Sequence, residues 1–399
     1  MTAQPAPAPV GWRLPALATA ALALLAGMYA GLLLAGVPLP APATPVEQVH
    51  GPLLVFGFVG TLIALERAVA LGARWALLAP ICSGAGGAAL LLDVPAVAGK
   101  TLLMLASVLL LATYRALWRR QPAVAVLVQA GGAFAWYAAT LLWLAGFPVA
   151  EFVVWLVTFV VLTIAGERLE LAHVGLRHGH AERWLLAALV TLTVAATAAM
   201  VWPGPGTQAY GAALLTVAAW LVTFDVARHT VRGGGLPRYV AVGLLAGYGW
   251  LALAGLLWAG AGPATDGPRY DATLHAVFLG FVLSMIFVHA PVILPAVLRV
   301  PLPYHPVFHV PLALLHGSLL VRLVAGDAAG IEAVWRWAAV ANVTAVLAFA
   351  GCAVAVSLAR PRRGSRASTP GVAAGRVAAV SASGSGPAAA RPVSRGVAP

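Results

Sequence analysis

Charged residues are scarce in this chain. Only 9% of its 399 residues are charged, whereas 61% are hydrophobic. A soluble domain of this length needs more charge on its surface to stay in solution. Apolar runs of about 20 residues recur from end to end, which is the length that a hydrocarbon core roughly 30 Å thick requires. The composition excludes a soluble globular protein and indicates an integral membrane protein.

Cysteine, lysine and the motifs of soluble enzymes are also nearly absent. Cys82 and Cys352 both fall in apolar runs without paired spacing, so we expect neither a disulfide framework nor a zinc site. Lysine occurs once, at Lys100, which we attribute to a coding bias. The sequence contains no phosphate-binding glycine loop, nucleophile elbow or zinc-protease helix. It leaves open whether the protein is an enzyme.

The apolar runs predict an all-α integral membrane fold of about twelve transmembrane helices. They would form one polytopic domain over residues 12–358, preceded by a cytoplasmic segment of residues 1–11. Residues 359–399 hold seven arginines and no acidic residue, which predicts a disordered basic cytoplasmic tail. We expect this tail to meet anionic lipid headgroups and not nucleic acid. The expected spans are 12–37, 49–71, 74–93, 98–118, 122–146, 150–172, 183–203, 209–228, 237–261, 271–298, 306–326 and 333–358.

Arginines are distributed unequally between the two ends of these spans. They gather in the connections after even-numbered spans, as at Arg119, Arg120 and Arg228, whereas the odd connections carry acidic residues such as Glu151. The positive-inside rule therefore places both termini on the cytoplasmic side of the inner (plasma) membrane. This orientation puts the starts of the second and tenth spans together on the outer side.

The second, sixth and tenth spans show weak internal similarity. Residues 50–71 align without gaps with residues 151–172, and the Gly-Phe-Val of residues 57–59 recurs at residues 280–282. This spacing hints at three four-helix units of the kind that frame sites in membrane proteins. Apolar sequences also align by chance, so the threefold repeat and a chance likeness both remain open.

Two histidines open the second and tenth spans. His50 precedes Gly-Pro-Leu-Leu-Val-Phe-Gly-Phe, and His275 precedes Ala-Val-Phe-Leu-Gly-Phe. A polar ring in a membrane helix costs free energy, and a neutral imidazole is a standard axial ligand of haem iron. If both helices enter from one side, we expect His50 and His275 to hold one haem between them. Arg322 and Arg269 are the expected partners of the haem propionates.

The layout resembles subunit I of the haem-copper oxidases and nitric oxide reductases. The segments from His50 to Phe58 and from Leu274 to Ala276 are closer to the NnrS family, which comprises haem- and copper-containing membrane proteins associated with denitrification and nitric oxide stress. This resemblance implies haem b, copper as a further metal, and a small gas or an electron-transfer protein as partner. The family usually has a second histidine near the first, where this chain has Gly51 and Pro52. The copper pattern of oxidase spans six and seven is absent.

A second group of histidines lies toward the cytoplasm. His289 follows His275 by fourteen residues, or roughly 21 Å along a helix, too far for one iron to bind both. His309 and His316 share one face at the start of the eleventh span. We expect His289, His309 and His316 to form a separate site for copper or a second haem. The alternative is that His309 and His316 hydrogen-bond to backbone or to Glu66 and Glu167.

Two Glu-Arg pairs, Glu66-Arg67 and Glu167-Arg168, lie where the second and sixth spans approach the cytoplasm. Snorkelling of interfacial charges is the default interpretation. A proton relay or an ion-pair lock is the sharper alternative.

Two main classes of function follow. One is a haem-binding, or haem- and copper-binding, protein of redox or nitric oxide metabolism. The other is a multi-pass transporter of a small solute or metal ion. An assembly scaffold for a respiratory complex is a third class. The few carboxylates and several histidines within the spans favour the haem-binding protein.

Overall fold

The computed structural model describes residues 11, 13–40, 42, 44–92, 94–172 and 179–359, and every regular element in these residues is a helix. Eleven helical segments in this part of the chain are long and apolar enough to cross a membrane. The chain is therefore an all-α multi-pass membrane protein, as its composition predicts. Residues 1–10 and 360–399, expected as a cytoplasmic segment and a basic tail, lie outside the described residues.

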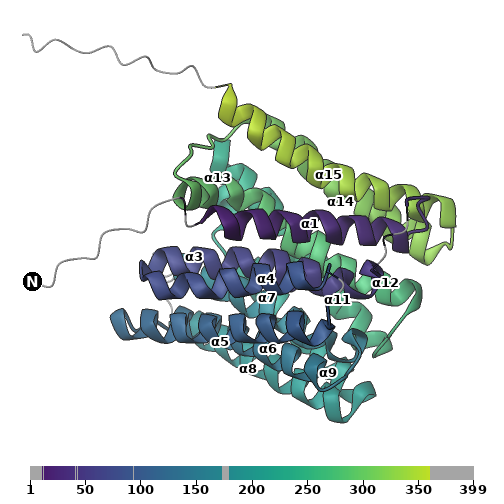
Figure 1. Cartoon of the computed structure of the whole chain (residues 1–399), viewed down its shortest axis with the longest axis horizontal. Helices are drawn as coiled ribbons and strands as arrows, with labels where there is room; N and C mark the ends of the chain where they lie inside the picture. Colours follow the sequence, from purple (N-terminus) through teal and green to yellow (C-terminus); the bar gives the residue numbers. More distant parts are fainter. Residues whose placement is uncertain are drawn as a thin grey trace, which may run out of the picture. The chain divides into compact units, whose positions relative to one another are not determined.

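Figure 1 shows the main helices. Their bounds are α1 (Leu14–Leu34), α3 (Thr61–Leu71), α4 (Leu78–Ala89), α5 (Ala96–Arg120), α6 (Val124–Leu144), α7 (Val149–Ala172), α8 (Gly179–Val201), α9 (Pro203–Phe224), α11 (Gly235–Ala261), α12 (Gly267–His275), α13 (Ser284–Leu298), α14 (His309–Val321) and α15 (Glu332–Leu358), with the short helices α2 (His50–Pro52) and α10 (Ala227–Thr230).

Prolines and glycines mark several helix ends. α9 begins at Pro203 and α12 has Pro268 in its first turn, where the missing proline N–H is no loss to the helix. Gly72 and Gly262 follow α3 and α11 with φ angles of +70° and +69°. Glycine adopts these angles without the clash that a Cβ atom brings, so the chain turns there.

One expected span is shorter than the others. The third expected span consists of a 3-10 turn followed by α4, which has only 12 residues. A helix of this length measures about 18 Å, which is less than the thickness of the hydrocarbon core of a bilayer. The Arg120 guanidinium at the end of α5 donates to the carbonyl of Leu71 at the end of α3. The ends of α3 and α5 therefore lie on the same side, so α4 must join the two sides. With this short segment the described chain crosses twelve times.

Contacts between distant residues show that the bundle begins and ends on one side. Arg13 Nη1, just before α1, donates to the carbonyl of Val297 at the end of α13 over 2.6 Å. Arg336 Nε, in the first turns of α15, donates to the carbonyl of Ala35 over 3.3 Å. α1 and α15 thus run side by side in opposite directions (Figure 1). Twelve crossings, an even number, likewise place the first and last helix ends on the same side.

The second and tenth spans share an irregular feature. Each contains an eight-residue π-helical segment, η3 (Leu53–Gly60) shortly after His50 and η5 (Ala276–Leu283) directly after His275. A third π-helical segment, η7 (Arg322–Ala328), follows α14. π-helical turns are rare in proteins, and those that occur are often found at functional sites. The sixth span does not share this feature, because α7 is α-helical from Val149 to Ala172. The threefold repeat that the sequence left open stays a prediction.

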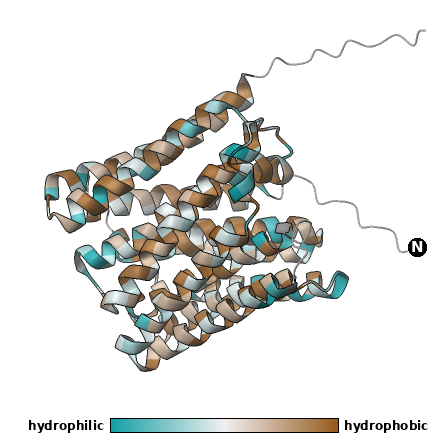
Figure 2. Cartoon of the chain, turned by 180° about the vertical axis from the view of Figure 1, so that it is seen from behind, coloured by the Kyte–Doolittle hydropathy of each residue, from teal (hydrophilic) through white to brown (hydrophobic). Residues whose placement is uncertain are grey.

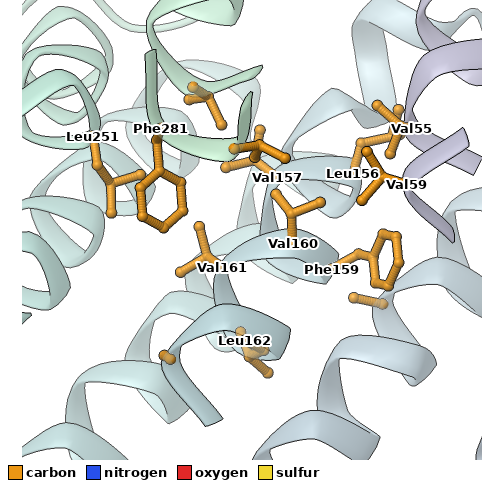
Figure 3. Close-up of a cluster of buried hydrophobic side chains, with 14 of the residues drawn as sticks. Val55, Val59, Leu156, Val157, Phe159, Val160, Val161, Leu162, Leu251 and Phe281 are labelled. Atoms are coloured by element: carbon orange, nitrogen blue, oxygen red, sulfur yellow. The ribbon is translucent and has the colours of Figure 1, made fainter. Parts of the chain in front are cut away.

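α7 is the central helix of the core. Figure 3 shows its Val157 and Val160 surrounded by apolar side chains of neighbouring helices, among them Val55 of η3 and Phe281 of η5. Figure 2 shows hydrophobic residues along the helices and hydrophilic ones gathered toward their ends. Apolar residues do not drive helices together in lipid, so close packing must hold the bundle. This packing sets the two histidine-bearing spans around α7.

Candidate functional site

A cavity of about 670 Å³ opens between the starts of the second and tenth spans. Its lining includes both His50 and His275, together with residues of α1, α7, η7 and α15. This volume lies within the range of about 300–1,000 Å³ that is usual for small-molecule and cofactor sites. Val153 and Leu156 of α7 form part of an apolar wall, and Asp271 and Arg322 are among the polar groups.

His50 is held against α1. Its Nδ1 lies 2.7 Å from the carbonyl oxygen of Gly27. Because a carbonyl oxygen only accepts, Nδ1 carries the proton, and Nε2 of the neutral ring has a free lone pair. A Cβ atom at Gly31 would lie 2.8 Å from Cε1 of the imidazole, so the ring occupies this position only because residue 31 is glycine. Helix α1 therefore determines both the position and the tautomer of His50.

His275 is held by Asp271, one helical turn earlier. Its Nδ1 lies 2.8 Å from the backbone oxygen and 3.1 Å from Oδ1 of Asp271. The same carboxylate accepts from Arg322 Nε and Nη2 over 2.9 and 2.7 Å and from Trp335 Nε1 over 3.2 Å. The Arg322 guanidinium also lies over the Trp335 ring, 4.9 Å from its centroid. A carboxylate that fixes Nδ1–H is a common support for a metal-binding histidine.

The two imidazoles are therefore in equivalent states. Both donate from Nδ1, and neither Nε2 atom has a hydrogen bond within the described residues. Across the part of the chain that the structure describes, no three His, Cys, Asp or Glu side chains are grouped to hold a metal ion.

The two arginines expected to bind propionates have other roles. Arg322 lines the cavity, but its guanidinium is bound to Asp271 through two hydrogen bonds. Arg269 is exposed, donates to the carbonyl of Pro263 over 2.7 Å and is not part of the cavity lining. Arg269 lies between the lining residues Pro268 and Tyr270, and its role toward propionates stays a prediction.

Sequence reasoning missed the partners that orient the two imidazoles. Asp271 had a readable signal, since it precedes His275 by four residues and so shares its helix face. Gly27, Gly31 and Trp335 had none, because they come from helices far away in the sequence.

The structure does not bring the three inner histidines together as one metal site. His316 accepts from Trp250 Nε1 over 2.9 Å, and its Nε2 lies 3.2 Å from Ser284 Oγ, so both nitrogens are engaged. His309 packs against the Tyr239 ring with centroids 5.0 Å apart. His289 bonds to the carbonyl of Met285 over 2.8 Å, and its buried Nε2 has no partner among the described residues. His316 therefore links α14 to α11 and α13 through the side chains of Trp250 and Ser284, and not through the backbone or the carboxylates that the alternative named.

Residues 13–358 match the family described as "Domain of unknown function (DUF8744)". The match covers more than half of the chain, so the chain belongs to this family. No curated protein and no solved structure gives a significant match.

Proposed function

We propose that this family member binds haem b through His50 and His275 and serves redox or nitric oxide-related metabolism. One observation carries the proposal: two imidazoles line one cavity, and each is fixed at Nδ1 so that its Nε2 is free to bind iron. A haem with two imidazole ligands supplies one-electron redox chemistry. Its expected partner is an electron-transfer protein or a small gas.

The chain's own residues would define the environment of the haem. The Gly27 carbonyl and the Asp271 carboxylate orient both rings and accept from Nδ1, which leaves each Nε2 directed away from these partners. The Asp271 carboxylate increases the basicity of the His275 imidazole as an iron ligand. The apolar wall that includes Val153 and Leu156 keeps water away from part of the cavity. These features tune ligand strength and local polarity, two of the means by which proteins adjust the potential of a haem.

The visible spectrum of the purified full-length protein tests this proposal. We expect a Soret band and reduced haem bands after dithionite, and their loss or shift in His50→Ala and His275→Ala. His229→Ala is the matched control, because His229 is exposed and remote from the cavity lining. Wild-type protein that stays colourless after expression with added haem would contradict the proposal. So would full, unshifted spectra in both cavity variants.

A second candidate function is the transport of a cation, as the sequence alternative expected. The cavity lining contains four carboxylates, Glu47, Asp271, Asp327 and Glu332, but only one arginine, Arg322. Arg322 is bound to Asp271, so the acidic excess attracts cations and offers little to propionates. Uptake of divalent metal ions by haem-free protein in vesicles would favour this function, provided that Glu47→Gln with Asp327→Asn abolishes it.

The arginine asymmetry supports an orientation with both termini in the cytoplasm of the plasma membrane. The cavity would then open toward the outer side. Partners that supply electrons or gas would therefore reach it from outside the cytoplasm.

A further inference from the structure

A half-buried ionic cluster lies at the opposite end of the bundle from the cavity. Arg67 of α3 is central to it and contacts carboxylates of α3 and α7. Arg67 Nη2 pairs with Glu66 and lies 3.9 Å from Glu167, while Nη1 lies 3.8 Å from Glu170. Nη1 also donates to Oε1 of Gln129 on α6 over 3.4 Å. We call Glu66, Arg67, Gln129, Glu167 and Glu170 the inner cluster.

Negative charge exceeds positive charge in the inner cluster. Three carboxylates surround one guanidinium, and the side chains of Glu66 and Glu167 are only 26% and 25% exposed. Arg168, the next cation along α7, lies 3.9 Å from the buried Asp225 carboxylate and pairs with it. Unpaired charges of one sign at low dielectric repel each other strongly and favour the neutral form of one member.

A second observation points into the same cluster. Tyr114 of α5 is 1% exposed, and its hydroxyl has no hydrogen-bond partner within the described residues. The charges of Arg67, Glu167, Glu66 and Glu170 all act on this phenol. A buried hydroxyl without a partner is costly, so Tyr114 brings an unsatisfied polar group to the same region.

The geometry favours a proton over a metal ion as the ligand of the inner cluster. The carboxylate oxygens converge on the Arg67 guanidinium, which occupies the centre that a metal ion would need. These carboxylates do not form a metal-binding group in the described part of the chain. A proton needs only one oxygen atom and removes one negative charge.

We propose that Glu66, Glu167 and Glu170 form a proton-binding site that holds at least one exchangeable proton. The proton comes from water, bonds to a carboxylate oxygen and returns to water. Glu170, whose side chain is 57% exposed, connects the buried carboxylates with solvent at the end of α7. Within the described residues, Arg67 and Arg168 are the cations that act on Glu167. Tyr114 is a further titratable group, on which the charges of the cluster act. The site does not depend on haem in the cavity.

Infrared spectroscopy of the full-length protein tests this proposal directly. A solvent-exposed glutamate with a pKa of about 4.3 is ionised at pH near 6, whereas the inner cluster should retain a protonated carboxyl group there. Its C=O stretch should shift in D₂O, because the proton exchanges. We expect Glu167→Gln, which mimics the neutral form without a large change in shape, to remove this band. Glu151→Gln is the matched control on the same helix, since Glu151 is exposed and far along α7.

Two results would overturn the proposal. One is the absence of a protonated carboxyl band at pH near 6 in the folded wild-type protein. The other is a band of full intensity in each of the single variants Glu66→Gln, Glu167→Gln and Glu170→Gln. Circular dichroism on the same samples shows which variants are folded, and only these are compared.

Discussion

At the scale of single residues, Asp271 connects the candidate site to the rest of the bundle. Its carboxylate joins His275 on its own helix to Arg322 and Trp335 on two others. Arg322 is 6% exposed, so its charge depends on this partner. Removal of one member of a buried ion pair leaves an uncompensated charge, which is strongly destabilising. Asp271 is therefore expected to serve both stability and ligand orientation.

We expect Asp271→Ala to lower the free energy of unfolding by about 3–5 kcal/mol, because Arg322 loses its buried partner. Haem affinity should fall by about 10- to 100-fold, because His275 loses the carboxylate that orients it. Arg269→Ala, two residues earlier, is the control, and as an exposed position it should stay within about 0.5 kcal/mol. Thermal unfolding in detergent and haem titration measure the two effects. Equal behaviour of the two variants would contradict this role of Asp271.

At the scale of helices, glycines set how closely the spans approach. α9 and α11 meet at Gly211 and Gly255. A Cβ atom at Gly211 would meet the backbone of α11 at Ala259 and would lie 2.7 Å from the Gly255 oxygen. Backbone atoms of two packed helices cannot move aside as a side chain does. Small residues at such contacts are typical of membrane bundles, where van der Waals packing holds helices together.

We predict that Gly211→Ala destabilises the protein by about 1–3 kcal/mol, because it forces α9 and α11 apart. Gly249→Ala on α11 is the control, since nothing lies within 4 Å of a Cβ atom there. Alanine has the better helix propensity by about 1 kcal/mol, so this control should be neutral or more stable. Melting temperatures of the two variants in one detergent measure the difference, and the reverse order would refute the close contact.

At the scale of the whole molecule, the number of crossings decides where each connection lies. Hydrogen bonds of Arg13, Arg120 and Arg336 place helix ends side by side and require the short α4 to cross. The connection before α11 is then on the side of Arg13, and the connection after α11 is on the other. These contacts relate the connections to one another, and the arginine asymmetry relates them to the cytoplasm.

We expect a reporter enzyme fused after Gly234 to report a cytoplasmic location and one fused after Gly262 an external location. Arg228, Arg232 and Arg238 flank the first position, which is the basic side of the chain. The two fusions differ only by α11, so each is the control of the other. An external location at Gly234 would overturn both the proposed orientation and the outward opening of the cavity.

Local sequence patterns were sufficient for the class of the protein and for most of its helices. Hydropathy predicted the spans, and the arginine pattern predicted that both ends lie on one side, because each pattern depends on residues close in the chain. The sequence also singled out His50 and His275, which the structure brings to one cavity. The shortness of α4 was not predicted, because a hydropathy run includes the apolar turn residues beyond the helix end.

Contacts between distant residues decided the rest. The Gly27 carbonyl that orients His50 lies on α1, and the Arg322 guanidinium at the cavity binds Asp271. The helix face shared by His309 and His316 did not reveal that Trp250 and Ser284 engage the nitrogens of His316. A periodicity shows which residues share a face, but the hydrogen-bond partners of a buried polar group depend on which helices pack beside it. Sequence thus determined where polar groups enter the membrane, and the tertiary structure decided which of their atoms remain free to act.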